Sequence, residues 1–295
     1  MSYISKETRI LIRKALKEDI GEGDVTTRLF VPPSLIGVAR IDMKSKGIFA
    51  GSEVAREVFL AVDPRLKVKQ FLKEGNSVSK SKKVMEIYGR VSSILKAERV
   101  ALNFLAHLSG VATLTHRFVE RVRGTRAKIY DTRKTTPLWR SLERRAVCAG
   151  GGRNHRFGLW DEILVKDNHW EAMWDLLNKT RCRYFFDRLK KLKHKHIPIE
   201  IEVDSFRELK HLFDGTVRIN RVLLDNFSVR ELKKAVQFVR KTHPKLLLEA
   251  SGGINLTNVR QAAKTGVDRI SIGALTHSAP ALDFSLSLLK INHGA

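Results

Sequence analysis

The chain has 295 residues, of which 43% are hydrophobic, so a disordered protein is excluded and a sizeable core is possible. Its 55 Lys and Arg against 31 Asp and Glu give a formal net charge of +24 at pH 7, which favours an anionic partner. The chain has two cysteines and no apolar run near the roughly 18 residues that cross a bilayer, so we expect a soluble, cytoplasmic protein.

The first part of the chain predicts a small α/β domain. Apolar residues spaced by three and four predict helices at 6–18, at 53–62 and from 94 to about 122. Strand-like stretches lie between them, namely IGVARIDM, LKVKQFL and KKVMEIYGRV. We therefore place an N-terminal α/β (open-faced) sandwich at residues 1–115, which a C-terminal helix at about 280–295 could also join.

The second part, residues 116–280, alternates short apolar runs with helical segments. The runs are AKIYDTRK, EILVKDN, IEIEVDS, VLLDNFS, LLLEASGG and RISIGAL. This alternation predicts parallel strands, and we expect an incomplete (β/α) barrel with its active site at the carboxyl ends of the strands. The polar residues that end each run could instead be turn punctuation, but turns do not need the lysines and arginine found there.

Residues 179–196 form a strongly basic segment with eight Lys or Arg and one acid. Leu189 and Leu192 suit a thin buried stripe, so we interpret the segment as the solvated face of a helix. A nucleic-acid or partner-binding patch is the alternative.

Cationic side chains follow two of the predicted strands and also lie in the region between them. Arg133 and Lys134 end the first run, His155 and Arg156 lie in the following region, and Lys166 ends the next run. Cations that converge on one barrel mouth repel one another unless an anion neutralises them. The sequence therefore predicts a substrate with at least two negative groups.

Acidic side chains end two further strands. Glu202 closes IEIEV and Asp225 lies in LLDN, and carboxylate oxygens are the ligands that Mg²⁺ prefers. Glu200 would share a strand face with Glu202 because side chains alternate along a strand. The alternative is that these acids form internal salt bridges with nearby cations.

Glycines in the last two runs predict a phosphate site. Ser251-Gly252-Gly253 precedes a segment in which Asn255 or Thr257 could open a helix, and such a helix start binds anions. The other glycine cluster, Gly150 to Gly152, is interpreted as a flexible turn that delivers His155 and Arg156. Oxidoreductase and serine-hydrolase chemistry are not favoured, because neither G-x-G-x-x-G nor G-x-S-x-G occurs.

The stretch DTRKTTPLWRSLERRAVCAGGGRNHRFGLWDEILVKDNHW resembles the signature of the quinolinate phosphoribosyltransferase family. The later IEVDS, LLDNFS, EASGGI and SIGALTHS are similar too, as are EDIGEGDVTT, GIFAG and AERVALNFLAHLSGVAT near the amino end. The resemblance covers nearly the whole chain. It departs in the basic segment 179–196 and at Leu138-Trp139, where the family usually has Gly-Leu.

The resemblance implies an enzyme of de novo NAD biosynthesis. Quinolinate and phosphoribosyl pyrophosphate would react with Mg²⁺ to give nicotinate mononucleotide, pyrophosphate and carbon dioxide. The fold would be an N-terminal sandwich and an incomplete barrel. The chain would form a homodimer or a higher homo-oligomer with shared active sites, which Arg99 would enter from the other subunit. The residues that would line the quinolinate pocket are Arg133, His155, Arg156 and Lys166, and Thr132 would be a further substrate-binding residue.

The resemblance also implies roles in the transfer itself. Lys134 would lie near the reacting diphosphate, and Glu202 and Asp225 would serve the ribose and hold Mg²⁺, partly through water. These three residues are the expected catalytic set. The expected 5′-phosphate contacts are Ser251, Gly252, Gly253, Ser271, Ile272 and Gly273, with His277 as a further contact.

Two other functions were weighed against this one. A relative of the same fold could act on a different acceptor, as the molybdenum-associated homologues do, but the complete TRK, NHR and KDN set favours a dicarboxylate. A nucleic-acid-binding protein needs aromatic residues for stacking, and only residues 184–186 lie near a basic run. We therefore expect neither nucleic acid nor a membrane as a partner.

Overall fold

The computed structural model describes residues 4–79, 81–174, 197–214 and 219–292, and the basic segment 179–196 lies outside these ranges. The chain divides into two compact units. The first consists of Met1–His116, Thr135–Gly151 and Leu275–Ala295, and the second of Arg117–Lys134 and Gly152–Ala274.

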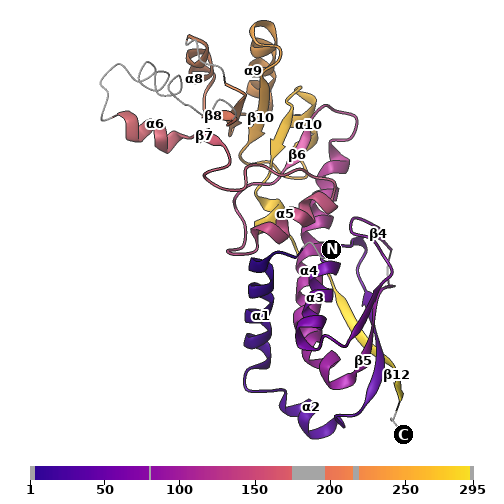
Figure 1. The fold of residues 1–295 in the computed structure, drawn as a ribbon. Helices are drawn as coiled ribbons and strands as arrows, with labels where there is room; N and C mark the ends of the chain where they lie inside the picture. Colours follow the sequence, from indigo (N-terminus) through magenta and orange to yellow (C-terminus); the bar gives the residue numbers. More distant parts are fainter. Residues whose placement is uncertain (1–3, 80, 175–196, 215–218, 293–295) are drawn as a thin grey trace. The chain divides into compact units, whose positions relative to one another are not determined.

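The first unit is built on an antiparallel sheet, which has four strands among the described residues, in the order β12-β1-β5-β3. In Figure 1 helices α1, α3 and α4 lie on one side of this sheet. Buried residues alternate along β1, as expected for a sheet that packs on one face. The strands are β1 (Ile36–Met43), β3 (Lys67–Gln70), β5 (Lys82–Arg90) and β12 (Phe284–Asn292), and β2 (Gly47–Ile48) pairs separately with β4 (Ser77–Val78).

The helices of the first unit follow the predicted apolar spacing. The expected helix at 6–18 is α1, whose N-cap residue Ser5 accepts a hydrogen bond from the backbone N–H of Thr8. The long helix expected at 94–122 is α4, which continues into the second unit. The helices are α1 (Lys6–Ile20), α2 (Val25–Phe30), α3 (Ser52–Val62), α4 (Val91–Arg121), α5 (Arg140–Ala149) and α11 (Ala274–His277).

The C-terminal segment is a strand, and the expectation of a helix at about 280–295 is wrong. Residues Phe284–Asn292 form β12, which pairs antiparallel with β1 along its whole length, with a register shift between Val38 and Ala39. Phe284, Leu286 and Leu288 alternate with polar residues in FSLSL, which is strand periodicity. The pairing also covers an edge of β1 that would otherwise leave its peptide groups without a partner.

The second unit contains a sheet that has six strands among the described residues, all parallel, in the order β6-β11-β10-β9-β8-β7. Its strands are nearly continuous apolar runs, which is typical of parallel strands buried on both faces. The strands are β6 (Lys128–Tyr130), β7 (Ile163–Val165), β8 (Ile199–Val203), β9 (Arg221–Asp225), β10 (Leu247–Ser251) and β11 (Arg269–Ser271). The described helices are α6 (Asp167–Trp174), α8 (Phe206–His211), η1 (Leu212–Asp214), α9 (Val229–Thr242) and α10 (Val259–Lys264).

The two end strands of this sheet, β6 and β7, are the first two along the chain, so the order is that of a β/α barrel left open between them. A short segment runs along β6 at this opening. Arg153 bridges Tyr130 in parallel, and its N–H donates to the carbonyl of Ile129 at 2.8 Å. The sandwich and incomplete-barrel fold predicted from the sequence is thus confirmed.

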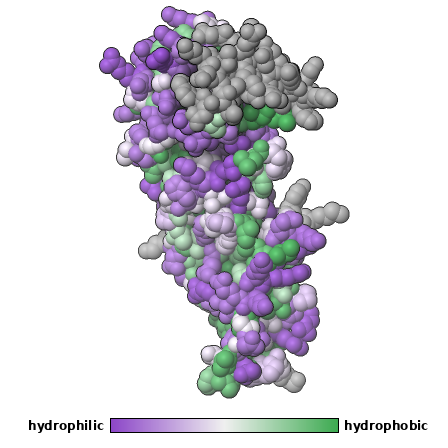
Figure 2. Space-filling model, turned by 90° about the vertical axis from the view of Figure 1, so that its left-hand side faces the viewer, coloured by the Kyte–Doolittle hydropathy of each residue, from purple (hydrophilic) through white to green (hydrophobic). Residues whose placement is uncertain are grey.

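On the face drawn in Figure 2, hydrophobic residues are scattered among hydrophilic ones. Of the helices in the described part of the chain, none combines the length and apolar character that crossing a membrane requires.

A tight turn connects the second unit to α5. The N–H of Trp139 donates to the carbonyl of Thr136 at 3.0 Å, with Pro137 and Leu138 between them. Leu138 has a φ of 68°, so the turn has the pattern of type II, which favours glycine at this third position. Leu138 is 79% exposed, whereas the indole of Trp139 stacks on Phe104 with ring centroids 4.6 Å apart. Where the sequence departs from the Gly-Leu of the family, Leu138 therefore has a strained backbone and Trp139 is well packed.

We expect Leu138→Gly to raise the free energy of unfolding by about 0.5–1 kcal/mol, because relief of left-handed strain exceeds the added chain entropy. Leu138→Ala is the matched control, since it removes the same exposed side chain but keeps Cβ. Urea denaturation of the three proteins measures the difference. A glycine variant no more stable than the alanine variant would show that the turn is unstrained.

Candidate active site at the carboxyl ends of the parallel strands

Because the six described strands run parallel, the residues that close them meet at one edge of the sheet. Asp225 and Ser251 are paired neighbours at the ends of β9 and β10. Lys166 follows β7, and Glu202 lies one residue before the end of β8. The residues predicted at this edge and found there are Thr132, Arg133, Lys134, Lys166, Glu202, Asp225, Ser251 and Ser271.

His155 and Arg156 reach the site from the segment at the barrel opening. Asp131, fully buried directly after β6, accepts a hydrogen bond from the backbone N–H of His155 at its carboxylate oxygen Oδ1, over 2.6 Å. The guanidinium of Arg156 donates to the backbone carbonyl of Glu162 at 3.1 Å, just before β7. These two contacts tie the segment to both strands that border the opening. Sequence reasoning missed Asp131, although it begins the DTRK stretch.

The cations of the site are held close to one another. Burial lowers the pKa of Arg156 first, and the nearby charge of Arg133 lowers it further. The ammonium of Lys166 forms an ion pair with Glu202, with Nζ and Oε2 2.5 Å apart. These contacts form one electrostatic cluster of Arg133, Arg156, Lys166 and Glu202. Within it, the predicted acid Glu202 forms an ion pair with one of the predicted cations, Lys166. Two guanidinium groups held together suit a ligand with more than one negative charge.

A cavity of about 470 Å³ opens beside this cluster and is lined largely by carboxylates. Glu202 and Asp225 are both part of its wall, as predicted for a cation site. Carboxylate oxygens are suitable ligands for Mg²⁺. The lining residues are Asp167, Trp170, Glu171, Glu202, Asp204, Glu208, Asp225 and Asn226.

Beneath the site, the barrel interior holds a layer of buried charges that sequence reasoning largely missed. Glu200 and Glu249 have no exposed surface, and Arg221 is 6% exposed. Arg221 forms an ion pair with Glu162, and its Nη2 lies 3.5 Å from Oε2 of Glu200. The sequence signal that could have revealed this layer is a charged residue within the apolar strands β8, β9 and β10, since a buried charge requires a buried partner.

His155 belongs to this inner layer as much as to the site. Its Nε2 lies 3.1 Å from a carboxylate oxygen of Glu200 and 3.1 Å from one of Glu249. Burial by itself lowers the pKa of His155, but the hydrogen bonds and charges of the two glutamates outweigh it and raise the pKa to about 9. Nδ1 accepts the backbone N–H of Arg156 at 2.8 Å. With Nδ1 accepting this hydrogen bond, the ring proton lies on Nε2, between the two glutamates, and a second proton on the ring would displace the Arg156 N–H from Nδ1.

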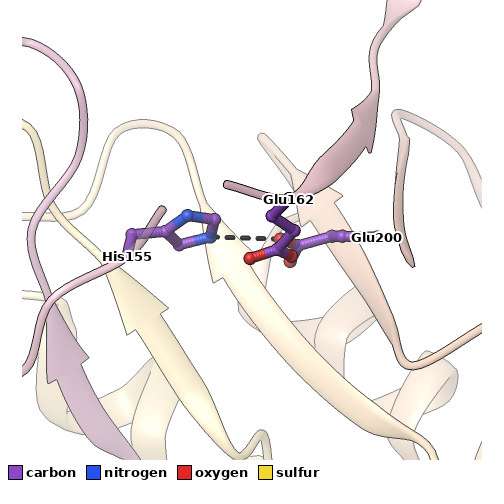
Figure 3. A group of neighbouring side chains, drawn as sticks. All are labelled: His155, Glu162 and Glu200. Carbon is purple, nitrogen blue, oxygen red and sulfur yellow. Dashed lines mark ion pairs between the residues drawn. The ribbon is translucent and has the colours of Figure 1, made fainter. Parts of the chain in front are cut away.

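Figure 3 shows His155, Glu162 and Glu200 converging, an arrangement with the donor atoms of a metal site. Arg221, however, already forms ion pairs with both carboxylates. The guanidinium of Arg221 thus supplies the positive charge that a metal ion would otherwise supply, and this cluster is a buried salt-bridge network. The acidic cavity above it, with Glu202 and Asp225, is the better candidate for a divalent ion.

The late glycines adopt conformations that few other residues could. Gly252 has a φ of 82°, and a Cβ added there would lie 2.7 Å from the backbone nitrogen of Asn226. Gly253 has a φ of 60° with open space around it. The helix expected after them starts later than predicted, because Asn255 caps a separate turn and α10 begins only at Val259.

The other predicted phosphate residues, at the end of β11, already make some contacts within the protein. The N–H of Ile272 donates to the carbonyl of Tyr130 at 3.0 Å. Ser271 is 5% exposed, and its hydroxyl helps to lower the pKa of Glu249, which burial raises. Gly273 follows, half-buried. A 5′-phosphate site at residues 271–273 remains a prediction.

Two predicted site residues, Arg99 and His277, are exposed residues of the first unit. Gly150 and Gly151 also belong there. A Cβ on Gly150 would lie 2.3 Å from the carbonyl oxygen of Ala112, and Gly151 has a φ of 87°. These glycines thus permit a close approach to α4 and a turn, so they have defined packing roles at the start of the segment that carries His155.

The cationic cluster, the carboxylate-lined cavity and the parallel strands together define a class, the α/β-barrel enzymes that act on anionic substrates. The chain matches the family models described as quinolinate phosphoribosyl transferase, N-terminal domain over residues 24–109 and C-terminal domain over residues 111–287. It belongs to the quinolinate phosphoribosyl transferase family, as the sequence resemblance indicated.

Individual relatives span nearly the whole chain. The nicotinate-nucleotide pyrophosphorylase [carboxylating] of Mycobacterium leprae is 39% identical over 285 residues, which are 95% of this chain and 96% of the relative. A solved structure of the nicotinate-nucleotide pyrophosphorylase from Francisella tularensis has a TM-score of 0.86 at 35% identity, covering 96% of each chain. That from Ehrlichia chaffeensis has a TM-score of 0.86 at 36% identity, covering 97% of this chain and all of the other.

Gly252→Ala should lower the free energy of unfolding by about 3 kcal/mol or more, because left-handed strain adds to a collision with the backbone of Asn226. Gly253→Ala is the matched control and should cost only about 1 kcal/mol, since it has the strain without the collision. Urea denaturation measures both. Equal losses would show that β9 and β10 do not approach as closely as the structure indicates.

Proposed function

We propose that the protein is a quinolinate phosphoribosyltransferase, a decarboxylating pentosyltransferase of NAD biosynthesis. It converts quinolinate and phosphoribosyl pyrophosphate to nicotinate mononucleotide, pyrophosphate and carbon dioxide. The observation that carries the proposal is that Arg133 and Arg156 lie near enough for the charge of Arg133 to lower the pKa of Arg156, beside a carboxylate-lined cavity. The family and the names of its relatives support the same activity.

The dicarboxylate would bind at the cationic cluster. Arg133 is exposed, and Arg156 is buried but held at the opening by Glu162, so both guanidinium groups can face one ligand. Lys166 would exchange part of its pairing with Glu202 for a substrate carboxylate. Guanidinium forks and ammonium groups bind carboxylates with charge-assisted hydrogen bonds. Thr132 is a further proposed substrate-binding residue, and His155 lines the inner side of the proposed quinolinate pocket.

Phosphoribosyl pyrophosphate would extend from the cavity to the late glycines. Glu202 and Asp225 would lie near the ribose, and Ser251, which is paired with Asp225, leads to the glycines proposed for the 5′-phosphate. Ser271, Ile272 and Gly273 end the adjacent strand and belong to the same proposed phosphate site. His277 is a further proposed contact.

The carboxylates around the cavity fit Mg²⁺, because their oxygens are hard ligands and they gather in an otherwise strongly basic protein. Glu202 and Asp225 would hold the ion, partly through water. When bound, Mg²⁺ would supply positive charge that offsets the charge of the diphosphate leaving group.

The protein's own residues would act mainly by position and charge. As the anomeric C–O bond to the diphosphate breaks, positive charge develops on the ribose, and the carboxylates of Glu202 and Asp225 would stabilise it. Lys134 would stabilise the departing diphosphate. The pyridine nitrogen then forms the new bond to the anomeric carbon, and the cationic ring accepts the electron pair released when the adjacent carboxylate leaves as carbon dioxide. Holding both substrates in place supplies much of the rate.

A shared active site in a homodimer or higher homo-oligomer is part of the proposal. Arg99 is exposed on α4 and would enter the quinolinate pocket of another subunit. A cytoplasmic location is proposed from the low cysteine content, which suits a reducing compartment.

The purified protein should release pyrophosphate only when quinolinate, phosphoribosyl pyrophosphate and Mg²⁺ are all present. One carbon dioxide should appear for each pyrophosphate, because the ribosylated ring loses its carboxylate in every turnover. A coupled pyrophosphate assay with carboxyl-labelled quinolinate measures both products. Pyrophosphate release with nicotinate in place of quinolinate, and none with quinolinate, would overturn the proposed substrate.

Lys134→Ala should lower kcat by about 100-fold or more and change the Kd of quinolinate by less than about threefold, because the charge is needed on the leaving group. Lys128→Ala is the matched control. Lys128 is an exposed lysine at the amino end of the same strand, β6, and its loss should leave both values unchanged. Parallel losses of turnover and quinolinate affinity in Lys134→Ala would instead place this residue in the dicarboxylate pocket.

A further inference from the structure

The segment from Arg153 to Glu162 fills the opening of the barrel and brings Arg156 to the site. Its backbone is tied to β6 by the bridge between Arg153 and Tyr130 and by the carboxylate of Asp131. Its far end is tied near β7 by Arg156, through the carbonyl of Glu162. Both ties lie at the borders of the opening, and a third contact joins the segment to the interior of the barrel beside Arg156.

The imidazole of His155 makes that third contact, and it points into the barrel. Its Nε2 lies between Oε2 of Glu200 on β8 and Oε1 of Glu249 on β10, at 3.1 Å from each. Its Nδ1 accepts the backbone N–H of Arg156 at 2.8 Å. Nδ1 is thus hydrogen-bonded, Nε2 lies within ion-pair distance of two carboxylates, and the side chain is 7% exposed.

Glu200 and Glu249 come from strands that are separated by β9, so His155 spans the interior of the barrel. Neither glutamate has exposed surface, and neither has a role in the proposed chemistry. Two buried carboxylates without nearby donors would destabilise the fold. Glu200 also has an ion pair with Arg221, whereas Glu249 has the imidazole and the hydroxyl of Ser271, with the charge of Arg269 acting on it from further away. Glu249 is therefore the more specific probe of the contact with His155.

We propose that Glu249 and Glu200 are positioning residues for the dicarboxylate, and that His155 is the internal tie through which they hold Arg156 opposite Arg133. In this role the imidazole orients the guanidinium that meets the substrate and does not itself bind the substrate. The inference rests on the proposed function for its substrate, and it refines the predicted role of His155 from contact to tie.

Kinetics of three variants test the role. Glu249→Leu removes the acceptor at similar size and should raise the KM of quinolinate by about tenfold or more, with kcat and the KM of phosphoribosyl pyrophosphate changing less than about threefold. Glu249→Gln keeps an oxygen acceptor and should restore most of the lost affinity. Asp268→Asn is the control, because Asp268 is a buried carboxylate with arginine partners just before β11, at the opposite edge of the sheet.

Asp268→Asn should lower stability and leave the KM of quinolinate unchanged. A quinolinate KM within about twofold of wild type in Glu249→Leu, or the same increase in Asp268→Asn, would overturn the positioning role.

A measurement on the wild-type protein tests the tie without any turnover. With ¹⁵N-labelled histidine, and with His155 assigned through His155→Gln, the ring should show a proton on Nε2 both before and after saturation with quinolinate. A large change in either ring nitrogen on binding would make the imidazole a substrate ligand and overturn the inference. Hydrogen exchange of the His155 and Arg156 amides should also be faster in Glu249→Leu, and unchanged exchange would count against the tie.

These readouts separate the inference from the proposed function. If the wild-type protein shows no quinolinate-dependent turnover but its His155 and Arg156 amides exchange slowly, and faster in Glu249→Leu, the proposed function is refuted and the role of His155 stands. If the enzyme is active but these amides exchange at wild-type rates in Glu249→Leu, the role of His155 is refuted and the proposed function stands.

Discussion

The parallel pairing of the strands in the second unit is the constraint on which the site depends. Residues that are far apart in sequence, such as Lys134, Lys166, Asp225 and Ser251, share one property, which is that they follow or close a strand. Because the described strands all point the same way, these residues arrive at one edge of the sheet without any further device. Once the apolar runs form the sheet, the polar residues that follow them are already close together.

Charge is distributed unevenly over this scaffold. The chain carries a net charge of +24, yet the cavity beside Glu202 and the interior beneath it are rich in carboxylates. The inner acids pair locally with Arg221 and His155, apart from the cationic cluster at the strand ends. A basic exterior attracts anions in general, and the acidic cavity is the place proposed for a cation within it.

Much of this site could be predicted from the sequence, because a polar residue that ends an apolar run has a position fixed by the fold. Arg133, Lys166, Glu202 and Asp225 were found in this way. Contacts across the barrel could not be found, since they join residues on strands that are not neighbours in sequence or in the sheet. Glu249 lies in the apolar run LLLEAS, where its charge was visible but its partner, His155, was not.

Local conformation was predictable only where a residue type demands it. Pro137 marks the turn before α5, but nothing in the sequence shows that Leu138 takes the left-handed position. The C-terminal segment was expected to be a helix, although FSLSL alternates with strand periodicity. Its apolar content suits either element, and the decisive factor is the free edge of β1, which lies about 250 residues earlier in the chain and is known only from the fold.

The pairing of β1 with β12 also has a consequence for the order of events during synthesis. The first unit includes the earliest helix of the chain and its final strand, whereas the second unit is made of segments that lie between them. Domains often fold from the amino end as the ribosome delivers them. Here the sheet of the first unit lacks the strand beside β1 until residues 284–292 have been made, after every described strand of the second unit. The parallel sheet can therefore form before the antiparallel sheet is complete.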